Sequence, residues 1–240
     1  MNDIETKNLT KDFGDFRAVD NLSLSIESGK ITGLLGPNGA GKTTTIQMLL
    51  DIITPTSGEI KFFGMDLHKN KEEILSKINF SSPYVALPSN LTVMENLLTF
   101  ARLYGVKKPK DKIGELADFF EIRNLLERIT GSLSTGQLTR VNLTKAFVNN
   151  PKLLLLDEPT ASLDPYITDK TLTVLKRMQE ENGTTILYTS HNMAEIERIC
   201  DRVIFINKGA LRDDGTPADL IKKFGHKDLN DVFISIANED

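Results

Sequence analysis

The sequence predicts an α/β fold with a parallel sheet at its core. Two continuous apolar runs, at residues 30–36 (KITGLLG) and 152–156 (KLLLL), have the character of strands that are buried on both faces. Predicted strands and helices alternate over the last third of the chain, which is typical of a parallel sheet covered by helices. The chain has 240 residues, of which 40% are hydrophobic, and this composition supplies a sizeable core and excludes a disordered chain.

The N-terminal stretch reads as extended chain with turns. Residues 4–9 predict a strand, Gly14 and Asp15 predict a turn, and apolar residues alternate with serines over residues 22–26. The strand at 30–36 is followed at once by a helix predicted over residues 43–50, which is free of glycine and proline. A further short strand is predicted at residues 58–63.

Helical signals dominate from about residue 83 to residue 150. Helices are predicted over residues 92–104, 109–120 and 134–148, the last of which stops before Pro151. Alternation follows, with strands at residues 152–156, 184–189 and 202–206 and helices at 165–181 and 193–200. Thr216 followed by Pro217 predicts the start of another helix, and Gly225 predicts its end.

A phosphate-binding motif lies between the first buried strand and its helix. Residues 36–44 read GPNGAGKTT, in which two glycines are separated by four residues and followed by lysine and a hydroxyl residue. Backbone amides of such a loop wrap around phosphate oxygens, and the helix N-terminus adds positive potential. The lysine reaches the terminal phosphates, and the first hydroxyl coordinates Mg²⁺. The predicted nucleotide contacts are Gly36, Asn38, Gly39, Ala40, Gly41, Lys42, Thr43 and Thr44.

Two adjacent carboxylates, Asp157 and Glu158, follow the second apolar run. Strand ends of a parallel sheet face the ligand crevice. We therefore expect Asp157 to bind Mg²⁺ together with Thr43, and Glu158 to orient and polarise the water that attacks the γ-phosphate. The alternative is that two acids mark the start of a surface loop. The leucines before them and Pro159 after them favour the metal site.

These motifs together resemble the ATP-binding cassette family, the nucleotide-binding subunits and domains of ABC transporters. Residues 133–137 read LSTGQ, similar to the family signature LSGGQ, and precede LLLLDEPTASLD at 153–164 as in the family. Ser190 and His191 match the switch histidine of the family, and Phe13 takes the place of the aromatic residue that stacks on adenine. The resemblance covers nearly the whole chain, and the order and spacing of the motifs agree.

The resemblance implies an α/β fold of the P-loop NTPase cassette type. Its parts are a parallel-sheet core, an N-terminal antiparallel β subdomain and a helical subdomain. One nucleotide-binding domain would span residues 1–240, with the helical subdomain at about 83–150 inserted into the ATP-binding core. The resemblance also implies ATP and Mg²⁺ as cofactors and hydrolysis of ATP. Phe13 would stack on the base, Glu158 would act on water, and His191 would contact the γ-phosphate.

The signature residues are implied to act on a second subunit. Ser134, Gly136 and Gln137 would close over the ATP bound to the opposite chain, so that two subunits hold two nucleotides. Asp164 would lie in the loop through which the two sites sense each other, although an aspartate before Pro165 is equally an ordinary helix cap. A histidine at a strand end, such as His191, is more often a loop residue when taken alone, and only the rest of the constellation favours a catalytic role.

Two positions depart from the family pattern. Pro83 stands where most relatives carry a glutamine that touches Mg²⁺ and relays the nucleotide state, and proline has no side-chain oxygen for a metal. We expect Pro83→Gln to change coupling more than ATP affinity. Thr135 replaces the second glycine of the signature, and its side chain is expected to crowd the γ-phosphate or to require a different backbone conformation.

The most favoured function is an ATPase subunit that drives an integral membrane permease, with the subunit paired as a homodimer or heterodimer and bound to the inner face of the membrane. The closing DVFISIA and the segment around the phosphate loop resemble exporters for drugs, polysaccharides or lipids.

A soluble ABC ATPase of ribosomes or DNA and a P-loop kinase are the alternatives. LSTGQ argues against the kinase, and a formal charge of -4 does not favour nucleic acid. A single cysteine and the lack of a leader-like start indicate a reducing, cytosolic compartment.

Overall fold

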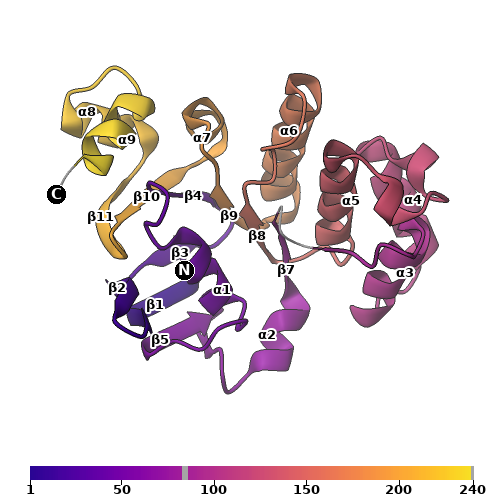
Figure 1. Cartoon of the computed structure of the whole chain (residues 1–240), viewed down its shortest axis with the longest axis horizontal. Coiled ribbons are helices and arrows are strands. Elements are labelled where there is room, and N and C mark those ends of the chain that lie inside the picture. Colours follow the sequence, from indigo (N-terminus) through magenta and orange to yellow (C-terminus); the bar gives the residue numbers. More distant parts are fainter. Residues whose placement is uncertain (83–85, 239–240) are drawn as a thin grey trace.

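The larger of two sheets runs through the middle of the computed structural model, which describes residues 1–82 and 86–238 (Figure 1). Within that part of the chain the sheet has six strands in the order β11-β10-β4-β9-β8-β7. All neighbours from β10 to β7 are parallel, and β11 is antiparallel to β10. The strands are β4 (Ile31–Leu35), β7 (Ile78–Ser81), β8 (Leu153–Asp157), β9 (Thr185–Thr189), β10 (Arg202–Asn207) and β11 (Ala210–Gly215).

A smaller, antiparallel sheet forms the N-terminal part of the fold. It contains β1 (Asn2–Phe13), β2 (Phe16–Leu22), β3 (Ser25–Glu27), β5 (Ser57–Phe62) and β6 (Met65–Asp66). Strand β1 pairs with β2, β3 and β5 in antiparallel register. The predicted parallel core with an antiparallel N-terminal β subdomain is therefore confirmed.

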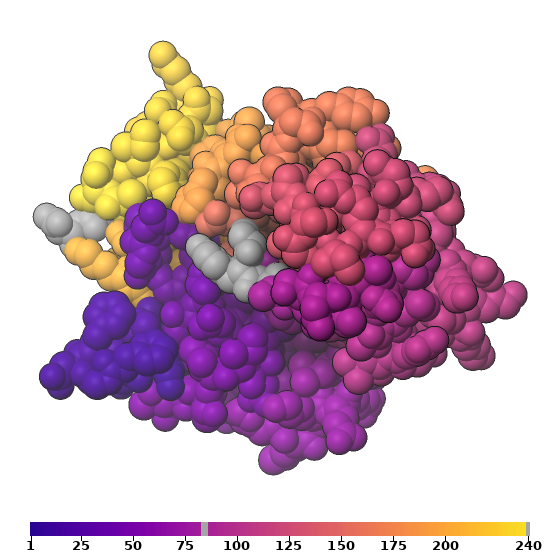
Figure 2. Space-filling view, turned by 45° about the vertical axis from the view of Figure 1, so that its right-hand side comes forward, coloured from indigo at the N-terminus to yellow at the C-terminus, as the bar shows by residue number. Residues whose placement is uncertain are grey.

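Helices cover the larger sheet and extend beyond one end of it. In Figure 1, α3, α4 and α5 lie at one end, and α8 and α9 lie beside β11 at the other end. In the space-filling view the helical segment, coloured magenta to rose, occupies the right-hand side of the molecule (Figure 2). The helices are α1 (Lys42–Leu49), α2 (Lys71–Lys77), α3 (Val93–Leu103), α4 (Pro109–Phe119), α5 (Thr135–Phe147), α6 (Pro165–Asn182), α7 (Met193–Ile199), α8 (Pro217–Phe224) and α9 (Leu229–Ala237).

The two faces of the larger sheet contact two separate hydrophobic clusters. Along β8, Leu153 and Leu155 pack with residues of the small sheet and α1, whereas Leu154 and Leu156 pack with the helical side. All four leucines are fully buried. The continuous apolar run is thus explained by burial on both faces, as predicted.

The structure contains elements that the sequence analysis missed. Strand β7 pairs in parallel with β8, but its sequence INFS is short and alternates apolar with polar residues. Its Asn79 is buried and donates to Asn149 Oδ1 at 2.9 Å, so the polar residue is satisfied inside the fold. Helices α2 and α9 and strand β11 were also not predicted.

Pro83, which stands where most relatives carry a glutamine, lies outside the described residues. Shortly after it, Ala86 is exposed and Leu87 is buried against the helical cluster. Among the described helices, none combines the length and the apolar character needed to cross a bilayer.

Candidate active site

The glycine-rich loop connects β4 to α1 and leaves the start of that helix open. Gly41 is the N-cap of α1 with a φ of 100°, a left-handed conformation that glycine adopts readily. A Cβ atom at this position would lie 2.6 Å from the Ala18 carbonyl oxygen, so β2 excludes any side chain here. In the described part of the chain no side chain caps the first turn of α1. The free backbone amides and the positive end of the helix dipole therefore form an anion site.

Lys42 lies folded across this loop. Its Nζ donates hydrogen bonds to the carbonyl oxygens of Gly36, at 2.6 Å, and Pro37, at 3.0 Å. Burial lowers the pKa of Lys42, and the nearby carboxylates of Glu158 and Asp157 oppose that shift. A phosphate in the loop would be a stronger, charged acceptor for this ammonium than either carbonyl group.

The other predicted loop residues differ in exposure. Ala40 is buried in the cluster beneath the small sheet, so its side chain fixes the loop to the core. Asn38, Gly39 and Thr43 are exposed, and Thr44 is half-buried. The Thr43 hydroxyl, at the second position of α1, is thus accessible to a ligand.

Asp157 is the last residue of β8 and is 5% exposed. Its neighbour in the register of β9 is Thr189, whose Oγ1 donates to Asp157 Oδ1 at 2.7 Å. Burial raises the pKa of Asp157, and the hydrogen bond from Thr189 opposes that rise. Asp157 Oδ2 accepts no hydrogen bond within residues 1–82 and 86–238, so one oxygen of a buried carboxylate remains for a hard cation.

Glu158 sits in a strained turn beside Asp157. Its φ of 47° is uncommon for a residue with a Cβ and is kept only where surrounding contacts enforce it. The Glu158 amide donates to Thr189 Oγ1 at 3.0 Å, and Glu158 Oε1 lies 2.9 Å from His191 Nε2. The structure therefore brings Lys42, Asp157, Glu158 and His191 together at the start of α1 and the ends of β8 and β9.

The sequence analysis missed two polar residues that build this arrangement. Thr189 bonds both Asp157 and the backbone of Glu158. Glu195, in α7, is 7% exposed and accepts hydrogen bonds from residues on either side of the site. One feature of the sequence could have indicated Glu195. It lies four residues before Ile199 and so shares the apolar face of the helix, where a carboxylate is unusual.

Phe13 ends β1 at the tip of the hairpin with β2. It is 49% exposed, and its partner in the strand register is Phe16, which is 62% exposed. Lys11 Nζ lies 5.0 Å from the centroid of the Phe13 ring. A half-exposed aromatic ring is therefore available at the tip of the small sheet.

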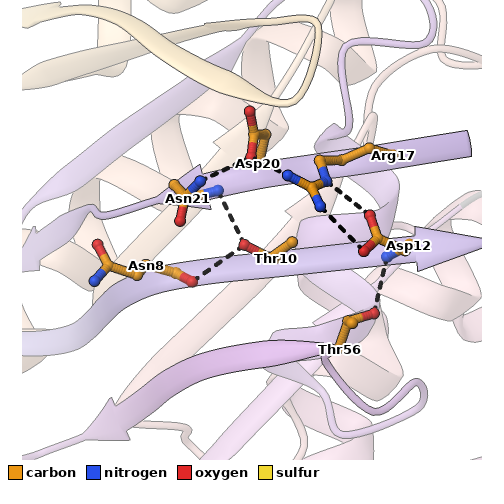
Figure 3. Close-up of polar contacts among 7 residues, drawn as sticks. All are labelled: Asn8, Thr10, Asp12, Arg17, Asp20, Asn21 and Thr56. Atoms are coloured by element: carbon orange, nitrogen blue, oxygen red, sulfur yellow. Dashed lines mark hydrogen bonds and ion pairs between the residues drawn. The ribbon is translucent and has the colours of Figure 1, made fainter.

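Polar contacts hold the two strands of this hairpin and tie it to Thr56, just before β5 (Figure 3). The Arg17 guanidinium lies between Asp12 and Asp20, with Nε donating to Asp12 Oδ1 at 2.8 Å and Nη1 to Asp20 Oδ1 at 3.0 Å. The Asp12 amide donates to Thr56 Oγ1 at 2.9 Å. Since Asp12 precedes Phe13, these contacts fix the direction in which the aromatic residue leaves the sheet.

The signature residues lie apart from the loop of their own chain. Ser134 Oγ accepts from the Gln137 amide at 3.3 Å, and Gln137 Oε1 accepts from the Ser134 amide at 3.0 Å, which makes a capping box at the start of α5. A Cβ at Gly136 would lie 3.0 Å from the carbonyl oxygen of Ser162, in the loop after β8. In the described part of the chain Ser134 and Gln137 form no hydrogen bond with the phosphate loop.

Thr135 and Asp164 both occupy helix starts. Thr135 is the first residue of α5 and is exposed, so its side chain takes an ordinary helical position rather than straining the loop. Asp164 is the N-cap of α6, and its carboxylate accepts from the Ile167 amide at 3.1 Å. The capping role of Asp164 is therefore confirmed, and its role between subunits stays a prediction.

The fold and this site define a P-loop ATP-binding protein, and the comparisons give its family. The family model described as ABC transporter matches residues 19–161, and the chain belongs to that family. It is 39% identical to the bacitracin transport ATP-binding protein BcrA of Bacillus licheniformis over 226 aligned residues. This alignment covers 94% of this chain and 73% of BcrA. It is 37% identical over 219 residues to the probable multidrug ABC transporter ATP-binding protein YbhF of Escherichia coli, with 90% of this chain and 38% of the relative covered.

Solved structures agree with this assignment. The structure of an ATP-binding subunit of an ABC transporter superposes with a TM-score of 0.91 at 26% identity, covering 98% of this chain and 99% of that one. The dimeric structure of the bacterial cassette MJ0796 gives a TM-score of 0.82 at 26% identity, covering 89% and 98%. The predicted family is confirmed, and the chain is an ATP-binding subunit of an ABC transporter that hydrolyses ATP for transport.

Proposed function

We propose that this chain powers export through a separate membrane permease by closing two cassette subunits around ATP and hydrolysing it. The observation that carries the proposal is the meeting of Lys42, Asp157, Glu158 and His191 at one edge of the parallel sheet. The side chains reach that edge from three places, the start of α1, the end of β8 and the loop after β9, and the chemistry of the group matches phosphate transfer to water.

The phosphate loop binds the nucleotide. The amides at the start of α1 receive the phosphate oxygens, and Lys42 exchanges its carbonyl partners for the terminal phosphates. Phe13 stacks on the adenine with its exposed ring, which the hairpin holds at the tip of the small sheet. The remaining contacts come from the loop residues predicted above, from Gly36 to Thr44.

Thr43 and Asp157 fit a magnesium site. Both supply hard oxygen ligands, the Thr43 hydroxyl is exposed, and Asp157 keeps one oxygen without a hydrogen bond in the described part of the chain. When bound, Mg²⁺ neutralises charge that develops on the phosphate oxygens. Thr189 orients the Asp157 carboxylate through the other oxygen.

Glu158 acts on the attacking water, and His191 contacts the γ-phosphate. In the present arrangement His191 Nε2 lies against Glu158 Oε1, so the imidazole also fixes the direction of this carboxylate. The hydrogen bonds from the Glu158 amide to β9 hold its strained backbone in place.

Ser134, Gly136 and Gln137 act on the nucleotide of a second subunit. Their place at the start of α5, bonded to one another, supports approach from outside the chain. The similarity to a dimeric cassette supports the same arrangement, with Asp164 near the contact between subunits. A homodimer is the simplest solution, because one chain supplies one phosphate loop.

The relatives indicate the kind of transport. BcrA is described as a bacitracin transport protein and YbhF as a probable multidrug transporter, which supports export of an amphipathic compound rather than contact with nucleic acid. The chain would form one nucleotide-binding domain over residues 1–240, with residues 83–150 as its helical subdomain. It would bind the cytoplasmic face of the membrane through the permease.

The proposal is tested with Lys42→Ala and Glu158→Gln in the full chain. Lys42→Ala should abolish Mg²⁺-dependent ATP binding in calorimetry, because the terminal phosphates lose their cation. Glu158→Gln should bind ATP, lose turnover and accumulate an ATP-bound dimer in light scattering. Glu127→Gln, at an exposed position of the helical segment, is the matched control. Unchanged turnover of Glu158→Gln in the assembled transporter would contradict the assignment.

A further inference from the structure

Glu195 is a buried carboxylate that neutral donors surround. Its Oε2 accepts from Tyr188 Oη at 2.7 Å, from Thr160 Oγ1 at 2.8 Å and from Ser190 Oγ at 3.0 Å. Its Oε1 accepts from Asn192 Nδ2 at 3.2 Å. In the described part of the chain no lysine, arginine or histidine forms an ion pair with it. A carboxylate kept in such a place depends entirely on these hydrogen bonds.

The donors come from both sides of the candidate active site. Thr160 lies two residues after Glu158, in the loop that follows β8, and Ser190 directly precedes His191, in the loop that follows β9. Glu195 belongs to neither loop, since it projects from the first turn of α7. One carboxylate therefore links the backbone segment of Glu158 to that of His191.

The strained backbone of Glu158 has to be held in place by contacts on both sides of it. Its positive φ persists only where the chain on both sides is held, and its amide is fixed before the turn by Thr189. Thr160, just after the turn, is fixed by Glu195 and by Tyr188 Oη at 3.2 Å. Burial and the Glu195 charge raise the pKa of Tyr188 well above its ordinary value, so its phenol remains a donor.

We propose that Glu195 is a positioning residue that holds the loops after β8 and β9 at the separation at which Glu158 and His191 meet. The inference rests on the proposed roles of Glu158 and His191 and adds to them. Glu195 is 7% exposed, and it acts through Thr160 and Ser190. Packing alone would be served as well by an apolar residue, which carries no desolvation cost.

The test compares Glu195→Gln with Glu197→Gln in the full chain assembled with its permease. Both substitutions lie in α7, but Glu197 is exposed and, among the residues that the structure describes, accepts only from the Leu229 amide, at the start of α9. Glu195→Gln should lower kcat for ATP at least about tenfold, because a misplacement near 1 Å costs about 100-fold in rate. The ATP-binding stoichiometry and KM should stay within about twofold of the unaltered chain.

A second measurement separates positioning from folding. Thr160→Val removes the donor on the Glu158 side, so Thr160→Val combined with Glu195→Gln should be no slower than Glu195→Gln alone. Calorimetric stoichiometry counts the molecules that still bind ATP, so partial unfolding does not imitate a loss of kcat.

Four outcomes overturn the proposal. Turnover of Glu195→Gln equal to that of Glu197→Gln would show that the link is not needed, and additive losses in the double variant would show that Thr160 and Glu195 act separately. Joint loss of ATP binding and turnover would assign Glu195 to folding. If Glu158→Gln itself turns over normally, the proposed role of Glu158 fails first, and the positioning role fails with it.

Discussion

Two helix starts in this chain carry motifs expected to face phosphate, and they are built in opposite ways. Helix α1 begins at Gly41 with no side-chain cap, whereas α5 begins at Ser134 inside a complete capping box with Gln137. The first-turn amides of α1 are therefore left to bind an anion. In α5, the capping box already supplies a hydrogen-bond acceptor for one of these amides. Of these two helix starts, only that of α1, where glycine takes the capping position, is left without a side-chain cap in the described part of the chain.

The surroundings of the two helix starts differ as well. Beside α1 lie the carboxylates of Asp157 and Glu158, close enough to oppose the lowering of the pKa of Lys42. Beside α5 lies the loop after β8, whose Ser162 carbonyl faces Gly136. The α1 site has the charged groups needed for chemistry, and the α5 site has only a hydroxyl, an amide and a helix dipole. We therefore expect substitutions at α1 to act on binding within one chain, and those at α5 to act on pairing.

Exchanging one glycine in each helix start gives the largest contrast. Gly41→Ala should abolish measurable ATP binding, because its Cβ would meet the Ala18 carbonyl and the left-handed φ is unfavourable for alanine. Gly136→Ala, within α5, needs only a small shift from the Ser162 carbonyl and should leave ATP binding by the single chain unchanged. Calorimetry on both variants measures the difference. Equal losses of affinity would remove the distinction between the two helix starts.

The two helices also hold their lysines differently, which gives the second prediction. Lys42 is half-buried at the mouth of the loop, whereas Lys145, inside α5, is 2% exposed and donates to the Phe80 carbonyl oxygen at 2.8 Å. Burial lowers the pKa of Lys145 from 10.5 to about 8. In the unfolded chain the Lys145 amine keeps its proton up to about pH 10.5. Between about pH 8 and about pH 10.5 the unfolded state therefore binds more protons than the folded state, and the free energy of unfolding rises with pH.

The prediction concerns the free energy of unfolding and its dependence on pH. Relative to Lys145→Met, the unaltered chain should gain about 3 kcal/mol as the pH rises from about 8 to about 10.5, and nothing below pH 8. Urea denaturation of both chains at a series of pH values measures this difference. Lys152→Met, at an exposed position, is the control. Parallel curves for the unaltered chain and Lys145→Met would show that the amine is not desolvated.

The α1 site could be predicted from the sequence because its parts follow local rules. A glycine pattern after a buried strand, and acids at the end of another, place Lys42 and Asp157 with no knowledge of distant contacts. Strand β7 was not predicted because its Asn79 and Ser81 are buried through partners far along the chain. Glu195 was missed for a related reason, since Thr160, the donor that connects it to the Glu158 loop, lies 35 residues away in the sequence. Local pattern thus predicts the binding loop better than the network that orients Glu158.

A smaller effect is expected at the hairpin that carries the aromatic residue. Phe13→Ala should weaken ATP binding about tenfold, because stacking on a base contributes about 1–3 kcal/mol. Phe16→Ala is the matched control, since Phe16 is the register partner of Phe13 and more exposed. Competition between ATP and a fluorescent analogue measures both affinities. A larger loss for Phe16→Ala would move the base contact to the other strand of the hairpin.

The smallest effect on the single chain is expected at the start of α5. Ser134→Ala removes the side-chain half of the capping box and should cost about 1 kcal/mol of stability. ATP binding by the isolated chain should not change, because Ser134 lies apart from its own phosphate loop. ATP-driven pairing should nevertheless weaken when measured by light scattering in the Glu158→Gln background. Thr92→Ala, which breaks the equivalent capping box of α3, should cost similar stability and leave pairing intact. Since both variants lose the same kind of cap, a pairing defect confined to Ser134→Ala would separate contact with the second subunit from the stability of a helix end.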